Sequence, residues 1–340
     1  MQDRLVFLIG APRSGTTLTT RMLGSHARIY APAEPHLMPP LAHLGYHERV
    51  DRAPYDPVIT QIGLREFVGA LPGGEADYLE ALRRATDHLY GRALEAAGGG
   101  DLLFLDKTPA YALVLDFLVR LYPDARYIVL TRHPVAIWSS IVDSFFDGDH
   151  AAAHAHNPVL ERYVPALARF LRDAEVRKLH LRYEDLVADP ERHMRDLCAF
   201  LGIDFDPGMI DYGARSGGVQ TAARGLGDPV TVSRESRPTT SSVDKWTEAL
   251  GRDPQRLAQA REIVARLTDP DLRTLGYDAA GIRSELAAIA PREAGPGAAR
   301  MGRYALERRL LVMARRHTGE GQPLGRMVRF VRYACDVLLR

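Results

Sequence analysis

Residues 10–17 have the types and spacing of a phosphate-binding loop. They read GAPRSGTT and follow the continuous apolar run Leu5–Ile9. A nucleotide triphosphatase carries a lysine directly after the second glycine of this loop, where it reaches the β- and γ-phosphates. Here Thr16 has that position, and the nearest cation is Arg13. We therefore expect an anion-binding loop at a helix N-terminus that serves a chemistry other than triphosphate hydrolysis. The backbone N–H groups expected to bind the anion belong to Ser14, Gly15, Thr16 and Thr17.

The loop resembles a known family. GAPRSGTT is similar to the 5′-phosphosulfate loop of sulfotransferases that use 3′-phosphoadenosine 5′-phosphosulfate (PAPS). It is most similar to the branch that carries PRSGTT, which includes bacterial sulfotransferases and protein-tyrosine sulfotransferases. The resemblance extends through scattered motifs over residues 5 to about 250. It implies a P-loop-like α/β fold and an enzyme that moves the sulfuryl group of PAPS to an acceptor hydroxyl.

A second motif of this family lies in YIVLTRHPVAIWSS, residues 127–140. In the family, an arginine after a strand and a serine eight positions later bind the 3′-phosphate of the donor. Arg132 and Ser140 match this spacing. An arginine at a strand end offers two parallel N–H donors to a phosphate, and a serine hydroxyl adds a third. The resemblance thus predicts selection against ATP, which has no 3′-phosphate.

The resemblance also implies a general base. In tyrosylprotein-type enzymes a glutamate 21 positions after the loop arginine has this role, and Glu34 stands at that distance from Arg13. Cytosolic small-molecule sulfotransferases use a histidine in a KTH segment, where this chain has LDKTPAYA with Pro109. His36 remains the alternative base. Lys107, placed 25 positions before Arg132, matches a family lysine that stabilises charge on the bridging oxygen.

Two later segments match the donor-binding part of the family. LRYEDLVADP places Tyr183 near the nucleotide, and we interpret Glu184 and Asp185 as helix-start acids. SSVDKWTEAL carries Lys245 and Trp246, which match a donor-contacting lysine and a loop over the adenine. An upstream serine that assists the leaving group is expected, and Ser233 and Ser236 both remain candidates.

The implied reaction is an in-line transfer. Glu34 takes the acceptor proton, while Arg13, Lys107 and the loop N–H groups neutralise charge on the departing phosphate. A sulfuryl group carries less charge than a phosphoryl group, so we expect no metal requirement. The alternatives are a P-loop kinase, which needs a phosphate-reaching lysine and a Mg²⁺-binding acid, and a non-catalytic nucleotide-binding protein.

Composition narrows the class of protein further. The chain has 340 residues and a net charge of +1, which argues against nucleic acid as the main partner. Its two cysteines are too few for a disulfide framework. No apolar segment approaches the roughly 20 residues that span a bilayer, and the N-terminal apolar run is too short for a signal peptide. We expect a cytoplasmic protein. Of its 44 Lys and Arg residues only three are Lys, and two of those fall on predicted donor contacts.

Strand and helix patterns alternate along the first 285 residues. Alternation of this kind predicts parallel βαβ units and a three-layer α/β domain with a central parallel sheet, here assigned to residues 1–285. The histidines at 150, 154 and 156 are interpreted as part of a solvated loop rather than a metal site. The predicted strands are Leu5–Ile9, Leu102–Leu105, Tyr127–Leu130 and Leu179–Leu181. The predicted helices are Thr16–Ser25, Tyr78–Ala97, Ala112–Leu121, Val135–Asp143, His193–Leu201, Val243–Leu250 and Pro254–Leu267.

A linker at 291–300 separates a basic C-terminal extension. Residues 301–340 hold nine arginines against three acidic residues, and their apolar residues recur at near-helical spacing. The extension is interpreted as helices that pack on the parent domain, with contact to an acidic partner or a membrane surface as the alternative. Residues 35–75 and 143–165 are expected to shape the acceptor pocket. Their aromatic residues suit a partly apolar alcohol, a small molecule or a glycolipid.

Overall fold

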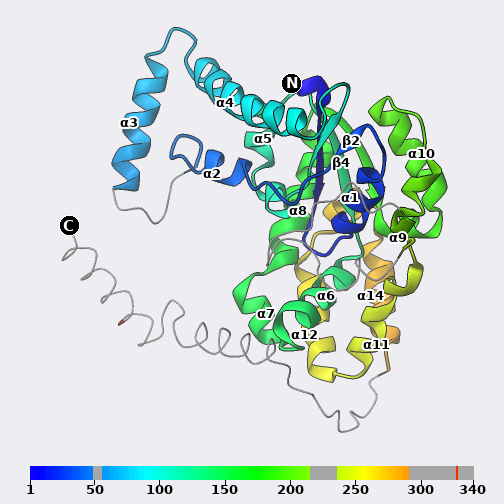
Figure 1. The fold of residues 1–340 in the computed structure, drawn as a ribbon. Helices are drawn as coiled ribbons and strands as arrows, with labels where there is room; N and C mark the ends of the chain where they lie inside the picture. Colours follow the sequence, from blue (N-terminus) through cyan, green and yellow to red (C-terminus); the bar gives the residue numbers. More distant parts are fainter. Residues whose placement is uncertain (49–55, 215–235, 291–326, 328–340) are drawn as a thin grey trace.

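A parallel sheet forms the centre of the chain (Figure 1). The computed structural model describes residues 1–48, 56–214, 236–290 and Met327. Within them, five strands lie in the order β2-β3-β1-β4-β5, and every neighbouring pair is parallel. The strands are β1 (Leu5–Gly10), β2 (Ile29–Tyr30), β3 (Leu103–Asp106), β4 (Arg126–Thr131) and β5 (Arg177–Arg182). The predicted α/β class with a central parallel sheet is confirmed.

Both faces of the sheet are covered, which explains the continuous apolar run of β1. Alternate side chains of a strand point to opposite faces. Leu5, Phe7 and Ile9 join one buried apolar cluster, whereas Val6 and Leu8 join a second. A strand buried on both faces needs apolar residues at every position. The structure is therefore three-layered, as the alternating pattern predicted.

The helices divide between the two clusters, with α4, α5 and α8 on one side of the sheet and α1, α9 and α10 on the other (Figure 1). The first cluster includes residues of α4 (Glu75–Ala96), α5 (Leu115–Leu121), α6 (Pro134–Phe146), α8 (Val159–Asp173), α11 (Lys245–Gly251), α12 (Pro254–Arg266), α13 (Asp269–Thr274) and α14 (Ala279–Ala288). The second includes residues of α1 (Thr16–Gly24), α9 (Tyr183–Ala188) and α10 (Pro190–Leu201). The first cluster also includes residues of α2 (Met38–Ala42) and α7 (His150–His156), and the remaining described helix is α3 (Pro57–Gly69). Short 3-10 turns are η1 (Gln2–Arg4), η2 (Pro109–Leu113), η3 (Pro207–Met209), η4 (Tyr212–Ala214) and η5 (Thr240–Ser242).

The strand order brings three chain segments to one edge of the sheet. β1 pairs with β3 on one side and with β4 on the other. Phe7 is opposite Asp106, and Gly10 is opposite Leu130. The carboxyl ends of parallel strands lie at the same edge, and ligands of open α/β sheets bind there. The residues that follow β1, β3 and β4 therefore emerge side by side.

Several elements differ from the prediction. The interpretation of the histidines at 150, 154 and 156 as a solvated loop is wrong, because residues 150–156 form α7. The Asp149 side chain accepts a hydrogen bond from the Ala152 amide at 2.9 Å and caps this helix. Ala152 and Ala153 are buried. Strand β2 and helices α3 and α8 are absent from the prediction. The predicted helical extension 301–340 lies outside the described residues, apart from Met327.

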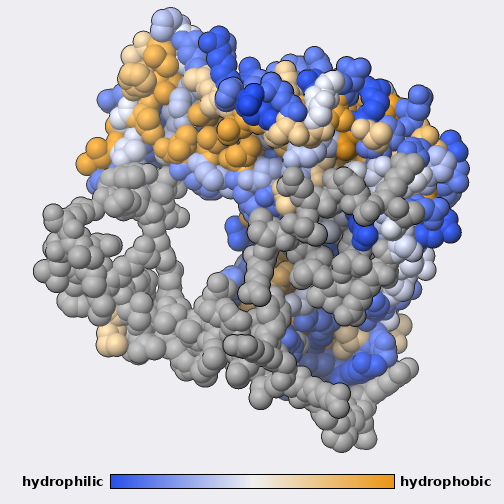
Figure 2. Space-filling model, viewed as in Figure 1, coloured by the Kyte–Doolittle hydropathy of each residue, from blue (hydrophilic) through white to orange (hydrophobic). Residues whose placement is uncertain are grey.

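Helix α3 carries exposed apolar side chains. Ile59 and Phe67 are 68% and 66% exposed, and Val58 and Ile62 are also exposed. Figure 2 shows the resulting hydrophobic area over this helix at the upper left of the molecule. Among the helices of the described ranges, none has the length and apolar character needed to cross a membrane.

Candidate active site

The loop after β1 is shaped by two residues with left-handed backbone. Arg13 has φ 70° and Gly15 has φ 95°, and Gly15 is the N-cap of α1. A Cβ on Gly15 would lie 2.4 Å from the Tyr183 ring, so only glycine fits there. The first N–H groups of α1 have no acceptor within the helix and favour an anion. The Ser14 amide differs from expectation, because it donates to the Ala11 carbonyl at 3.1 Å.

One cavity of about 510 Å³ opens at this loop. Its size is typical of a site for a nucleotide-sized ligand. Ten of the predicted site residues are in its wall: Arg13, Gly15, Thr16, Thr17, Glu34, Arg132, Ser140, Tyr183, Lys245 and Trp246. Ser14 and Lys107 do not line it, and both are buried. Segments far apart in the sequence thus meet at the carboxyl edge of the sheet.

Arg132 is a half-buried cation in this wall. It follows β4 and donates to the Arg13 carbonyl at 2.9 Å and to the Ser242 carbonyl at 2.5 Å. The Tyr183 ring lies 4.5 Å from the centre of its guanidinium. Burial lowers the pKa of Arg132 from its usual value, against the opposing effects of Tyr183 and Glu184. No carboxylate of the described residues forms an ion pair with this guanidinium, so an anionic ligand would stabilise the arrangement.

Arg13 and Ser140 lie close to this guanidinium. The Arg13 Nε donates to the Ser140 hydroxyl at 3.0 Å, across the cavity floor between the β1 loop and α6. The Arg13 guanidinium also lies over the Phe145 ring, 5.9 Å from its centre. The two arginines and Ser140 therefore form one cluster of donors, although Arg13 is more than 100 residues from the other two in the sequence.

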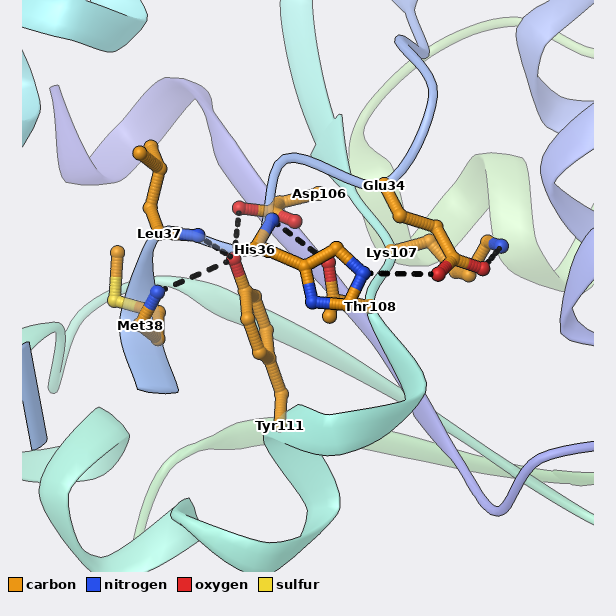
Figure 3. Close-up of polar contacts among 8 residues, drawn as sticks. All are labelled: Glu34, His36, Leu37, Met38, Asp106, Lys107, Thr108 and Tyr111. Carbon is orange, nitrogen blue, oxygen red and sulfur yellow. Dashed lines mark hydrogen bonds and ion pairs between the residues drawn. The ribbon is translucent and has the colours of Figure 1, made fainter. Parts of the chain in front are cut away.

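Glu34, one of the two candidate bases, contacts both the other candidate, His36, and the predicted lysine, Lys107 (Figure 3). The Lys107 Nζ lies 2.5 Å from Glu34 Oε1, and the His36 Nε2 lies 3.2 Å from Glu34 Oε2. The Glu34 side chain is 11% exposed, whereas that of His36 is 44% exposed. Glu34 lines the cavity between its two partners. Both carboxylate oxygens of Glu34 therefore have a partner, Lys107 for Oε1 and His36 for Oε2.

Lys245 and Trp246, at the start of α11, form another side of the cavity. The Trp246 ring stacks on the His133 ring, with centres 4.7 Å apart. Burial, together with Arg132 and Arg182, lowers the pKa of His133 to about 4, so this imidazole is neutral at physiological pH. The Lys245 Nζ donates to the Ser242 hydroxyl at 3.4 Å.

The sequence analysis overlooked Ser242. It lines the cavity and contacts both Arg132 and Lys245. Ser236 does not line the cavity, and its carbonyl instead accepts from the Gly213 amide at 3.0 Å. Ser233 lies outside the described residues. The only signal for Ser242 was its position three residues before Lys245, which places it on the same turn.

The acids after Tyr183 are in the first turn of α9, as predicted. Glu184 has a further contact set that the sequence did not indicate. One of its oxygens accepts from the His133 amide and the other from the Tyr277 hydroxyl, both at 2.8 Å. Glu184 therefore ties the start of α9 to His133, the residue directly after Arg132.

Residues from the expected acceptor regions also reach the cavity. His36, Ser144, Phe145 and Tyr163 line it. In the ranges that the structure describes, no group of three or more His, Cys, Asp or Glu residues could hold a metal ion.

Known proteins resemble this chain in sequence. A family model described as "Sulfotransferase family" matches residues 6–207. Nodulation protein NoeE of Sinorhizobium fredii is 31% identical over 346 residues, covering 94% of this chain and 76% of that protein. Protein-tyrosine sulfotransferase 1 of Danio rerio is 24% identical over 282 residues, covering 81% of this chain and 72% of that protein.

A solved structure shares the fold. The sulfotransferase domain from the curacin biosynthetic pathway aligns with a TM-score of 0.54, over 80% of this chain and 97% of that chain, at 23% identity. At this identity the likeness speaks for the fold alone.

Proposed function

The chain belongs to the sulfotransferase family, and from this premise we propose that it transfers the sulfuryl group of PAPS to a hydroxyl of a small molecule or glycolipid. Family membership makes it an enzyme of sulfuryl transfer. The donor, the base and the acceptor are our assignments from the cavity.

The half-buried guanidinium of Arg132, which has no ion-pair partner among the described residues, is the observation that carries the choice of donor. It has carbonyl and aromatic partners but no carboxylate among the described residues, and Ser140 and Arg13 lie beside it. The N-terminus of α1 offers a second anion site in the same cavity. Because β1 and β4 are adjacent, the two sites suit the two phosphate groups of one adenosine.

The residues fit a donor with phosphates at both the 3′ and 5′ positions. The loop N–H groups and Arg13 would hold the 5′-phosphosulfate, and Arg132 with Ser140 the 3′-phosphate. Tyr183, Lys245 and Trp246 would contact the rest of the nucleotide. The donor supplies the sulfuryl group, whose bond to the bridging oxygen breaks as the acceptor oxygen bonds to sulfur.

The mechanism assigns Glu34 as general base. Its Oε2 accepts the proton of the acceptor hydroxyl as that oxygen attacks. Lys107 holds Oε1, and its positive charge, buried behind the cavity wall, would stabilise the charge that develops on the bridging oxygen. Arg13 acts on the same charge from the cavity wall. His36 orients the carboxylate and remains the alternative base.

The acceptor side of the cavity supports an amphipathic alcohol. Phe145 and Tyr163 offer aromatic surface, whereas Ser144 and His36 offer hydrogen-bonding groups. This mixture suits a hydroxyl on a molecule that also has an apolar part. A sugar-containing lipid or a small aromatic alcohol meets this description.

Binding calorimetry tests the donor assignment. We expect adenosine 3′,5′-bisphosphate to bind at least tenfold more tightly than AMP, because only the former reaches Arg132. Equal affinities would overturn the assignment. Incubating the enzyme with isotopically labelled PAPS and a cell extract would then identify the product that gains sulfate.

Two experiments distinguish the proposed sulfotransferase from a kinase and from a non-catalytic nucleotide-binding protein. A P-loop kinase would stop when a chelator removes Mg²⁺, whereas the proposed sulfotransferase continues. A non-catalytic nucleotide-binding protein would bind the bisphosphate but transfer no label, with or without Glu34.

A further inference from the structure

A buried carboxyl group lies directly behind the proposed base. Asp106 is the last residue of β3 and is completely buried. Its Oδ2 accepts hydrogen bonds from the Tyr90 hydroxyl at 2.6 Å and the Tyr111 hydroxyl at 3.0 Å. Burial raises the pKa of Asp106 to about 7, against the opposing effect of these hydrogen bonds and the charge of Lys107. Burying a carboxyl group costs free energy, so its presence at this position needs an explanation.

Tyr111 connects this carboxyl group to the segment that carries Glu34 (Figure 3). Its hydroxyl donates to Asp106 and accepts from the amides of Leu37 at 3.1 Å and Met38 at 3.5 Å. Tyr111 is itself fully buried in η2. One phenol therefore links the end of β3 to the backbone three residues beyond the proposed base.

A second tie runs beside the first. The His36 amide donates to the Thr108 hydroxyl at 3.3 Å. His36 has φ 53°, a left-handed conformation that a non-glycine residue adopts at a cost of about 1–3 kcal/mol. Such a conformation persists only where surrounding contacts impose it. The ties from Thr108 and Tyr111 to residues 36–38 are contacts of this kind.

Both ties originate in the segment that also carries Lys107. Residues 106–111 thus fix the backbone after Glu34 and present the ammonium group that holds its carboxylate. The relative position of base and lysine depends on this shared anchor. A shift of about 1 Å in a reacting group can cost about 10²-fold in rate.

We propose that Asp106 is a positioning residue for the reaction: through Tyr111 its carboxyl group holds residues 36–38 and so sets where the Glu34 carboxylate lies relative to Lys107. The inference rests on the proposed sulfuryl transfer. Asp106 does not line the cavity, and it acts through Tyr111 rather than on the donor or the acceptor.

The paired variants Tyr111→Phe and Tyr90→Phe test this inference. Each removes one hydroxyl that donates to the same oxygen of Asp106, but only Tyr111 contacts residues 37 and 38. We expect Tyr111→Phe to lower kcat about 10- to 100-fold with the donor KM unchanged. Tyr90→Phe should stay within about threefold of the wild type. Equal losses of kcat in both variants would assign the network a merely structural role and overturn the proposal.

Variants at position 106 complete a double-mutant cycle. Asp106→Leu should lose about as much kcat as Tyr111→Phe, and the double variant should lose no more than either. Asp106→Asn keeps an oxygen that accepts from Tyr111 and should retain most of the wild-type kcat. Additive losses in the double variant would contradict the link through Tyr111.

Amide hydrogen exchange gives a readout that does not depend on activity. In Tyr111→Phe the amides of Leu37 and Met38 should exchange at least tenfold faster, whereas Tyr90→Phe leaves them unchanged. Unchanged exchange in Tyr111→Phe would overturn the inference, even if Asp106→Leu fails to fold. If the wild-type enzyme transfers no label from PAPS, the proposed function fails, and the exchange result alone decides whether Asp106 holds residues 36–38.

Discussion

Arg132 differs from the exposed arginines of the chain in the partners of its side chain. Exposed arginines elsewhere in the chain pair with acids, as Arg120 does with Glu75 at 2.8 Å. Arg132 has carbonyl partners that orient its guanidinium without neutralising it. Its side chain stays charged at any physiological pH, because even a lowered pKa of arginine remains far above neutrality. A ligand phosphate would supply the missing charge.

We therefore expect Arg132→Ala to raise the donor KM about 10²-fold, because truncating one partner of a buried charged pair costs about 2–5 kcal/mol. The turnover number should change less. Steady-state kinetics with varied PAPS measures both quantities. Arg120→Ala, which removes an exposed arginine far from the cavity wall, is the control. A donor KM that stays unchanged in Arg132→Ala would contradict our placement of the 3′-phosphate.

Because Glu34 and His36 contact each other, single substitutions at each position are needed to show which of them acts as the general base. We expect Glu34→Gln to lower kcat about 10²- to 10⁴-fold, since the amide keeps the shape but cannot take a proton. Affinity for adenosine 3′,5′-bisphosphate should stay within about threefold. His36→Gln should cost less than tenfold in kcat. The reverse order of the two losses would make His36 the base.

The raised pKa of Asp106 predicts a pH-dependent cost to stability. Below about pH 4 the carboxyl group is protonated in both folded and unfolded chains and contributes nothing. Between about pH 4 and pH 7 only the unfolded chain loses the proton readily, so the folded state is progressively disfavoured. We expect the stability of Asp106→Asn, relative to the wild type, to rise across this window and then level off. Urea unfolding of both proteins at pH 4.5, 6 and 8 measures the difference. A pH-independent difference would show that burial does not raise this pKa.

At the scale of secondary-structure elements, Gly15 determines the shape of the loop between β1 and α1. It caps α1 in a left-handed conformation and lies against the Tyr183 ring. Gly10 has a related constraint, because a Cβ there would lie 2.8 Å from the Leu130 carbonyl of the adjacent strand. The two glycines thus allow the loop to pass close to both β4 and α9.

We expect Gly15→Ala to destabilise the fold by about 1–3 kcal/mol and to weaken donor binding, because the residue must keep a left-handed φ and displace Tyr183. Gly91→Ala is the matched control. Gly91 lies inside α4 with nothing within 4 Å of an added Cβ, so alanine there should stabilise by about 0.5–1 kcal/mol. Urea unfolding midpoints decide the matter. Equal effects of the two substitutions would mean that the loop tolerates a side chain at position 15.

The elements that the sequence predicted best are those buried most uniformly. β1 and β4 read as apolar runs because both faces of each strand are covered. β2 was missed because two residues cannot establish a period. Helix α8 was missed although it has a buried face, since Pro165 lies inside it and interrupts the helical pattern.

At the scale of the whole molecule, charge is divided between a net acidic domain and a basic C-terminal extension. The nine arginines of residues 301–340 leave the rest of the chain net acidic. Contact of this extension with an acidic partner or a membrane surface stays a prediction, because these residues lie outside the described ranges apart from Met327. A glycolipid acceptor would make a membrane contact useful.

If the extension takes this alternative role, the full chain should sediment with vesicles of anionic phospholipid at low salt and dissociate as salt is raised. Changing Arg308, Arg309, Arg315 and Arg316 to Gln should reduce binding at least tenfold, at about 1 kcal/mol per basic residue near the surface. Changing Arg84, Arg92, Arg195 and Arg252, four exposed arginines of the described domain, is the control. Binding that survives the first set would exclude this role for the extension.

The sequence by itself determined the α/β class, the family and the identity of most residues around the cavity. These follow from local signals: a buried strand reads as an apolar run, and the GAPRSGTT loop depends on backbone geometry that specific glycines allow. Only the tertiary structure decided that Glu34 contacts both His36 and Lys107, that Ser242 rather than Ser236 lines the cavity, and that Tyr111 links Asp106 to Leu37. The reason is that these contacts join segments up to 110 residues apart, and their geometry follows from strand order and burial, which no local pattern encodes.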